Sequence, residues 1–273
     1  MAAPNVTFAV VDGVGIGGVQ RPTEDRVVHL PHAVVLADGA TALRPGDLSG
    51  GWYADHLCEA LTDLLTATPA ADLRDVLAAA IAKVADDHGL IPGAAPSSTV
   101  AMLRWTDTEL HGLVLADSPV VVFTDQGPEL LADERLATVA APGSYRQRLR
   151  EGGGYGRAHE AALRASGART SSLRNVDGGF WVAEADPAAA ARAQVATWPR
   201  HRVGAALLAS DGMSCGVDDY HLFDWQQVLD HAVAEGPAAV LATVWSAEAA
   251  DPDGARWPRA KRHDDKTLVL VRF

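Results

Sequence analysis

Aspartate residues stand at the ends of the most apolar runs in this chain, and that pattern could support metal chemistry. Three runs lead into an acidic residue and a fourth follows an acidic pair; the positions are Asp38, Asp117, Asp211 and Asp264-Asp265. Short apolar runs bounded by turn residues are typical of buried strands. Carboxylates gathered at one rim of such strands repel one another unless protons or cations neutralise them. The pattern therefore predicts a divalent-metal site.

The chemistry of such a site follows from the ligands. Hard cations such as Mg²⁺ and Mn²⁺ take oxygen ligands and keep several waters, so a few carboxylates suffice for two ions. Two ions roughly 3.5–4 Å apart can clamp a phosphoryl group and activate a water in line with the leaving oxygen. Glu24 and Asp25 add a further acidic pair just before a predicted strand. One Asp-Gly pair is a common turn, so the information lies in the whole set.

The elements that must position these carboxylates come in blocks. Strands are predicted at 6–11, 26–30, 33–38, 98–104, 109–116, 120–124, 129–131, 179–184, 202–210 and 267–271. Helices are predicted at 49–66 and 71–88, where apolar residues recur with a helical period, and near 225–235 and 237–247. Helices that follow strands without strict alternation indicate an α+β layering. We expect one domain spanning 1–273, because no repeat or linker interrupts the chain.

Composition narrows the class of protein. The formal net charge is −12, from 35 acidic and 23 basic residues, which argues against non-specific nucleic-acid binding because that requires a basic surface. Cys58 and Cys215 are too few for a disulfide framework. We see no signal peptide and no apolar run near the roughly 18 residues of a membrane span. We expect a cytoplasmic protein with no nucleic-acid and no membrane partner.

One segment, at about 140–178, departs from the acidic character of the chain. It contains Gly152-Gly153-Gly154 and a set of arginines at 146, 148, 150, 157, 164, 169 and 174. We interpret it as a basic, partly helical, flap-like insertion. Guanidinium groups pair with phosphate, so the segment suits an anionic substrate. The alternative interpretation, to which we give equal weight, is a helical face exposed to solvent.

Taken in order, the short motifs resemble those of the metal-dependent serine/threonine protein phosphatases of type 2C. Thr23-Glu24-Asp25 is similar to the family's Asn-Glu-Asp motif, Ala37-Asp38-Gly39 to its Asp-Gly-x-Gly-Gly motif, and Ser97-Ser98-Thr99 to its Gly-Ser-Thr strand. Further along, Ala116-Asp117-Ser118 resembles Gly-Asp-Ser, Ser210-Asp211-Gly212 matches Ser-Asp-Gly, and Asp264-Asp265-Lys266-Thr267 resembles Asp-Asn-x-Thr. The resemblance extends from about Val6 to Phe273, and its specificity lies in order and spacing.

This resemblance implies a four-layer α-β-β-α sandwich, in which two mostly antiparallel sheets are flanked by helix pairs. It implies that Asp38 bridges two Mg²⁺ or Mn²⁺ ions and that Gly39 offers its carbonyl to one of them. Asp211 and Asp264 would hold the first ion, with Glu24 or Asp25 serving the second. Asp117 could join Asp211 in the third, weaker site of bacterial members. Asp38, Asp211 and Asp264 would thus be the catalytic residues.

The resemblance also implies an activity: hydrolysis of phosphoserine and phosphothreonine in proteins by a metal-activated water, without a phosphoenzyme. The partner would be a phosphoprotein made by a serine/threonine kinase, in bacterial signalling, and the high Ala, Arg and Gly content hints at a GC-rich genome. Two other hypotheses stay open. The chain could be a non-catalytic, phosphatase-like binding module, or a phosphatase of a small phosphorylated metabolite.

Departures from the family pattern concern the handling of phosphate. The position of the family's phosphate-binding Arg is Gln20, and that of the proton-donating His of eukaryotic members is Ala40. Arg21 is the candidate substitute for substrate binding, although strand alternation would point it to the opposite face. Thr41-Ala42, Pro119 and Asp265 replace the paired glycines, an Arg and the final Asn. The pattern predicts a divergent enzyme with altered substrate choice.

Overall fold

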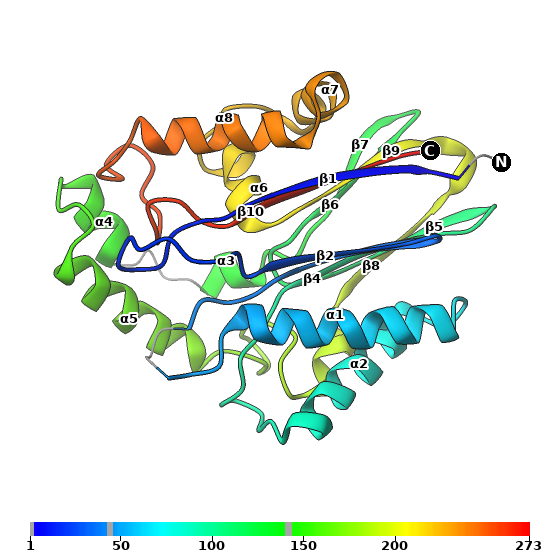
Figure 1. The fold of residues 1–273 in the computed structure, drawn as a ribbon, viewed down its shortest axis with the longest axis horizontal. Helices are drawn as coiled ribbons and strands as arrows, with labels where there is room; N and C mark the ends of the chain where they lie inside the picture. Colours follow the sequence, from blue (N-terminus) through cyan, green and yellow to red (C-terminus); the bar gives the residue numbers. More distant parts are fainter. Residues whose placement is uncertain (1–2, 43–45, 140–143) are drawn as a thin grey trace.

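The computed structural model describes residues 3–42, 46–139 and 144–273, and its centre is a pair of stacked antiparallel sheets (Figure 1). The first sheet has the order β1-β10-β9-β6-β7 and the second β2-β3-β4-β5-β8. The strands of the first sheet are β1 (Asn5–Val11), β6 (Val120–Thr124), β7 (Gly127–Leu131), β9 (Val203–Ala209) and β10 (Lys266–Arg272). Those of the second are β2 (Asp25–Leu30), β3 (Ala33–Asp38), β4 (Val100–Trp105), β5 (Glu109–Leu115) and β8 (Gln194–Pro199).

Helices cover the outer face of each sheet, which completes four layers (Figure 1). Two long helices, α1 (Gly50–Ala67) and α2 (Leu73–His88), lie on the second sheet. Three others lie on the first sheet: α6 (Asp211–Asp218), α7 (Trp225–Glu235) and α8 (Pro237–Ala249). The predicted α+β fold, a four-layer sandwich with two antiparallel sheets, is therefore confirmed.

Local sequence accounts for where these helices begin and end. The Ser49 side chain accepts a hydrogen bond from the Trp52 amide at the start of α1, and Asp72 does the same for the first turn of α2. Gly89 ends α2 in the left-handed conformation, with φ of 61°. Helix α7 starts with a capping box between Asp224 and Gln227.

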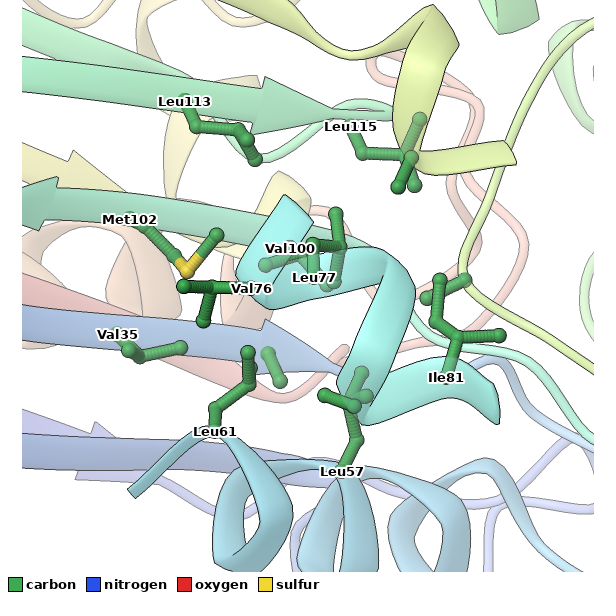
Figure 2. Packing of buried hydrophobic residues seen from close by; sticks show 14 of the residues in the cluster. Val35, Leu57, Leu61, Val76, Leu77, Ile81, Val100, Met102, Leu113 and Leu115 are labelled. Carbon is green, nitrogen blue, oxygen red and sulfur yellow. The ribbon is translucent and has the colours of Figure 1, made fainter. Parts of the chain in front are cut away.

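Three apolar layers hold the sandwich together. Figure 2 shows Leu57 and Leu61 of α1 and Leu77 of α2 packed against Met102 and Val35 of the second sheet. A second cluster fills the space between the sheets, and a third lies between the first sheet and α6–α8. Because both faces of the central strands are covered, β3, β4 and β6 are almost wholly buried, which explains their continuous apolar runs in the sequence.

The structure differs from the sequence-based elements in the segment before β9. The predicted strand at 179–184 is wrong: only isolated bridges occur there, at Phe180 and Ala183. The strand that completes the second sheet is β8, an edge strand that pairs with β5. Its burial pattern is mostly exposed, so it lacks the apolar run that identified the central strands.

The arginine-rich segment is largely helical, with α4 (Ser144–Arg150) and α5 (Arg157–Ser171) following the short helix α3 (Arg135–Val139). Residues 140–143 of the expected insertion lie outside the described residues. Helices α4 and α5 lie at the end of the sheets opposite the two chain termini (Figure 1). Within the described ranges, none of the helices has the length and apolar character needed to cross a membrane.

Candidate functional site

Sheet topology brings the predicted acidic residues to one end of the sandwich. Strands β3 and β5 are both antiparallel to β4, so they run in the same direction. Asp38, the last residue of β3, and Asp117, just after β5, therefore lie at the same end of the second sheet. In the first sheet, β9 runs antiparallel to β10, so Asp211 follows one strand where Asp264 precedes its neighbour. Asp25 lies directly opposite Asp38 in the β2–β3 register. We call Asp25, Asp38, Asp117, Asp211 and Asp264 the carboxylate centre.

The glycines that follow two of these aspartates permit close contacts between backbones. A Cβ atom on Gly39 would lie 2.3 Å from the carbonyl carbon of Gly50, and a Cβ on Gly50 would lie 2.3 Å from the Ala40 amide nitrogen. A Cβ on Gly212 would lie 1.9 Å from the Asp265 carbonyl oxygen. The Asp-Gly pairs are therefore crossing points, where the segment after β3 meets α1 and the start of α6 meets the start of β10.

Electrostatic repulsion characterises the centre. Burial raises the pKa of Asp38 well above its usual value, and the charges of other acidic residues raise it further. In decreasing order of effect these residues are Asp25, Asp211, Asp264 and Asp117. Asp211 lies at the exposed rim of the centre, yet desolvation by the surrounding protein and the charges of Asp264 and Asp117 also raise its pKa well above normal. The carboxylates are thus close enough for the charge of one to hinder the ionisation of another.

Asp25 is the most confined member of the centre, with 2% of its surface exposed. Its Oδ2 accepts a hydrogen bond of 2.7 Å from the Thr267 hydroxyl. Among the described residues, its buried Oδ1 has no hydrogen-bond partner, which is the kind of orphaned acceptor that a cation satisfies. Burial raises the pKa of Asp25 from 3.8 to about 6, against the lowering effect of the Thr267 hydrogen bond.

This shift predicts a pH-dependent difference between the wild type and Asp25→Asn in the absence of divalent ions. An acid whose folded-state pKa is raised favours the fold below its unfolded pKa and loses that contribution as pH rises through the folded value. A rise from 3.8 to about 6 corresponds to about 3 kcal/mol. Urea unfolding in chelator at pH 4 and pH 7.5 should show Asp25→Asn gaining about 2–3 kcal/mol relative to the wild type. A difference that does not change with pH would contradict the assignment.

Asp264 differs from the other members because a cation of the chain is bound to it. The Lys261 ammonium forms an ion pair with Asp264 Oδ1, and only 8% of the Lys261 side chain is exposed. Although burial acts in the opposite direction, Lys261 holds the pKa of Asp264 below its usual value. Lys261 belongs to the run Arg259-Ala260-Lys261-Arg262-His263, which directly precedes Asp264 in the sequence.

A second basic side chain, that of Arg21, forms ion pairs with acidic residues beside the carboxylate centre. One terminal nitrogen of Arg21 lies 2.7 Å from Asp265 Oδ2 and 2.8 Å from Glu24 Oε2, while Glu24 Oε2 also accepts from the Thr41 hydroxyl at 2.8 Å. Arg21 lies outside the strands, so the strand alternation that would turn it away does not apply. Asp265, which stands where the family pattern has Asn, gives this guanidinium its partner.

The start of β10 rests on a buried polar network that sequence reasoning missed. Glu248 of α8 lies 2.7 Å from the Lys266 ammonium and 2.8 Å from His263 Nδ1, and it accepts a hydrogen bond from the Tyr220 hydroxyl. Lys266 Nζ also donates to the Asp264 carbonyl oxygen at 2.9 Å. Glu248 and Lys266 are 1% and 0% exposed. His263 therefore points toward α8.

The arginine-rich segment packs on the loop that carries Lys261. His159 of α5 is buried and its Nε2 lies 2.8 Å from the Ala260 carbonyl oxygen. The Tyr155 ring lies beneath the guanidinium groups of Arg259 and Arg262. Further on, Arg174 forms an ion pair of 2.9 Å with the buried carboxylate of Glu184. The segment is thereby attached to the end of the sandwich where the carboxylates gather.

The donors of the centre fit a hard divalent cation in chemical type, since all are oxygens, and the orphaned Oδ1 of Asp25 supports that fit. They are not yet arranged as a cage. In the described part of the chain, no group of three or more His, Cys, Asp or Glu side chains is placed to hold a metal ion. Asp264 and Glu24 are engaged by Lys261 and Arg21. An ion that takes Asp264 Oδ1 or Glu24 Oε2 would have to displace these cations or lie beside them.

Comparison with known proteins supports the fold. No protein-family model matches the chain, and no curated protein matches it significantly in sequence. Solved structures match over almost the full length. PppA, described as a key regulatory component of the T6SS in Pseudomonas aeruginosa, is 20% identical with a TM-score of 0.54, covering 98% of this chain and 97% of that one.

Two further structures match to a similar degree. MsPP, a PPM Ser-Thr phosphatase of Mycobacterium smegmatis solved with cacodylate, is 17% identical with a TM-score of 0.56 and 98% coverage of both chains. The catalytic domain of the serine/threonine phosphatase PstP, solved with two manganese ions, is 18% identical with a TM-score of 0.55, covering 98% of this chain and 97% of that one. The resemblance to type 2C phosphatases is thus confirmed at the level of the fold.

Proposed function

We propose that this chain, which has the fold of the PPM serine/threonine phosphatases, is a metal-dependent phosphatase that hydrolyses phosphoserine and phosphothreonine in proteins. One observation carries the proposal. Separate segments of that fold place mutually repelling carboxylates at one end of the sandwich. The charges of four other aspartates raise the pKa of Asp38. Maintaining such a cluster costs stability unless cations neutralise it, which favours a functional reason for its presence.

The proposal assigns metal ligands within the centre. Asp38 would be shared by two Mg²⁺ or Mn²⁺ ions, with Asp211 and Asp264 on one and the Gly39 carbonyl on the other. For that second ion, Asp25 offers an oxygen that has no hydrogen-bond partner among the residues the structure describes, whereas Glu24 is already bound to Arg21. Asp117 with Asp211 would form a third, weaker site. When bound, such ions supply Lewis acidity and lower the pKa of a coordinated water.

Other residues of the chain would bind and orient the substrate. The Arg21 side chain is 20% exposed and fixed by Glu24 and Asp265, so we propose that its exposed part meets the phosphate. Helices α4 and α5 would form a flap over the same end, as one insertion in a single domain. Ala40 offers no proton to a leaving group, so p-nitrophenyl phosphate, whose leaving oxygen needs little assistance, would be turned over faster than phosphoserine or phosphothreonine. A cytoplasmic phosphoprotein made by a serine/threonine kinase is the proposed partner.

The proposal predicts metal-dependent turnover. Purified protein stripped with chelator should be inactive toward p-nitrophenyl phosphate and phosphothreonine peptides, and should gain activity on addition of millimolar Mn²⁺. A panel of phosphopeptides and small phosphorylated metabolites, assayed by phosphate release, separates a protein phosphatase from a metabolite phosphatase. The protein-phosphatase assignment fails if metabolites are turned over and peptides are not.

One observation favours the alternative of a non-catalytic binding module. Two of the acidic residues expected to hold metal already carry ion pairs to Lys261 and Arg21, and the described residues contain no preformed group of three ligands. A binding module would release no phosphate from any substrate of the panel with Mg²⁺ or Mn²⁺. It would nevertheless bind a phosphopeptide, as measured by isothermal titration calorimetry. Turnover that depends on Mn²⁺ would exclude it.

A further inference from the structure

Lys261 is held in place on both sides along the chain. The neighbouring Ala260 carbonyl lies 2.8 Å from His159 Nε2 of α5. Arg259 donates to the Arg262 carbonyl oxygen at 2.9 Å and forms a 2.9 Å ion pair with Asp251. The His263 carbonyl accepts from the Val14 amide at 2.8 Å. A lysine on so fixed a loop keeps its ammonium in one region, unlike the mobile lysines of an exposed helix.

The ammonium of Lys261 lies on a carboxylate that the proposed function assigns to a metal. It is ion-paired with Asp264 Oδ1, and 8% of the Lys261 side chain is exposed against 28% of Asp264. Asp264 Oδ1 also accepts a hydrogen bond from the Asp265 amide at 2.9 Å. A divalent ion that takes this oxygen must displace the ammonium or tolerate a positive charge beside it.

Resting on that proposed function, we propose that Lys261 is a tethered counter-ion that occupies Asp264 in the metal-free protein and weakens divalent-cation binding there. Binding of a divalent ion through Asp264 Oδ1 is then an exchange of one cation for another, or proceeds against the charge of the ammonium, rather than being the filling of a free ligand. The two cations repel each other over a short distance with little water between them. Lys261 therefore sets the concentration of Mg²⁺ or Mn²⁺ at which the centre fills, and α5 holds the loop that makes this possible.

The test compares charge-removing and charge-keeping variants in the full chain. Lys261→Met removes the ammonium with little change of shape, whereas Lys261→Arg keeps the charge. The matched control is Lys83→Met, which breaks a lysine–aspartate ion pair of 2.7 Å to Asp87 on the exposed face of α2. Isothermal titration with MnCl₂ reports affinity, and melting in chelator and in Mn²⁺ reports folding. Neither readout depends on activity.

Lys261→Met should bind Mn²⁺ at least about tenfold more tightly than the wild type. It should also melt lower in chelator, because Asp264 loses its partner, and show a larger rise in melting temperature with Mn²⁺. Lys261→Arg and Lys83→Met should retain the wild-type affinity. If Lys261→Met does not fold, Lys261→Gln, which can still donate a hydrogen bond to Asp264, tests the same loss of charge.

Equal or weaker Mn²⁺ binding by the folded neutral variant, with clear binding by the wild type, would overturn the role of Lys261 and leave the metal centre standing. Absence of Mn²⁺ binding from both the wild type and the neutral variant would overturn the metal centre as well. A tighter site in Lys261→Arg would also contradict the proposal, because that variant keeps the charge that is held responsible.

Discussion

The variant Asp38→Asn is expected to lose metal-dependent phosphatase activity by at least about 10³-fold, since it removes the carboxylate proposed to serve two ions, each worth several kcal/mol of transition-state stabilisation. The same variant should be more stable than the wild type in chelator. Burial and the charges around Asp38 raise its pKa well above the usual value, so the ionised form is a source of strain that a neutral amide of the same shape relieves. We expect a gain of about 1–2 kcal/mol in the free energy of unfolding.

Saturating Mn²⁺ should reverse the order of stability. A ligand that binds only the folded protein at about 100 times its dissociation constant adds about 2.7 kcal/mol, and Asp38→Asn should gain far less. Urea unfolding at pH 7.5 with chelator and with Mn²⁺ measures both values. Asp107→Asn, on an exposed hairpin turn, is the control and should follow the wild type. If Asp38→Asn loses activity but Mn²⁺ does not make the wild type the more stable of the two proteins, then Asp38 has a structural role rather than a metal-binding one.

The fold could be predicted from the sequence because its central strands and covering helices carry strong local patterns. Strand β3 is buried along most of its length, and helices α1 and α2 combine helical spacing with side-chain N-caps, while α2 also ends on a glycine. Aspartates that end such strands must meet if the strands share an edge, and the β2–β3 register does place Asp25 opposite Asp38. The position of these aspartates at the ends of neighbouring strands could therefore be predicted from local sequence pattern.

The parts that could not be predicted depend on contacts distant in sequence. Arg21 meets Asp265 across 244 positions, and nothing local to either residue indicates that pairing. Glu248 looks like a surface residue of a helix, and it becomes a buried partner of Lys266 only because α8 packs beside β10. Strand β8 is exposed along most of its length, so its sequence has no apolar run to mark it. Charge pairing and edge strands are decided by tertiary structure.

The Asp-Gly pairs combine a local pattern with a distant contact. The sequence identifies them as turns, and the structure shows that the glycine is also needed where two backbone segments approach closely. At Gly212 a Cβ atom would lie 1.9 Å from the Asp265 carbonyl oxygen and 3.2 Å from the Asp264 Cβ. No rotamer change can relieve a clash with backbone, so Gly212→Ala must push α6 and the start of β10 apart. Asp211 and Asp264, which belong to these two segments, would then separate. The variant should lose about 2–3 kcal/mol of stability, as overpacked sites do.

The loss of activity in Gly212→Ala should exceed what that destabilisation explains, because a displacement of about 1 Å in a catalytic constellation can cost about 10²-fold. The matched control is Gly204→Ala on β9, where an added Cβ meets nothing within 4 Å in the described part of the chain, and it should keep wild-type stability and turnover. Mn²⁺ titration at a temperature where both variants are folded separates the two effects: Gly212→Ala should bind the ion more weakly, while Gly204→Ala should not. If Gly212→Ala is destabilised but binds Mn²⁺ normally, then the crossing at Gly212 holds the fold together without setting the distance between Asp211 and Asp264.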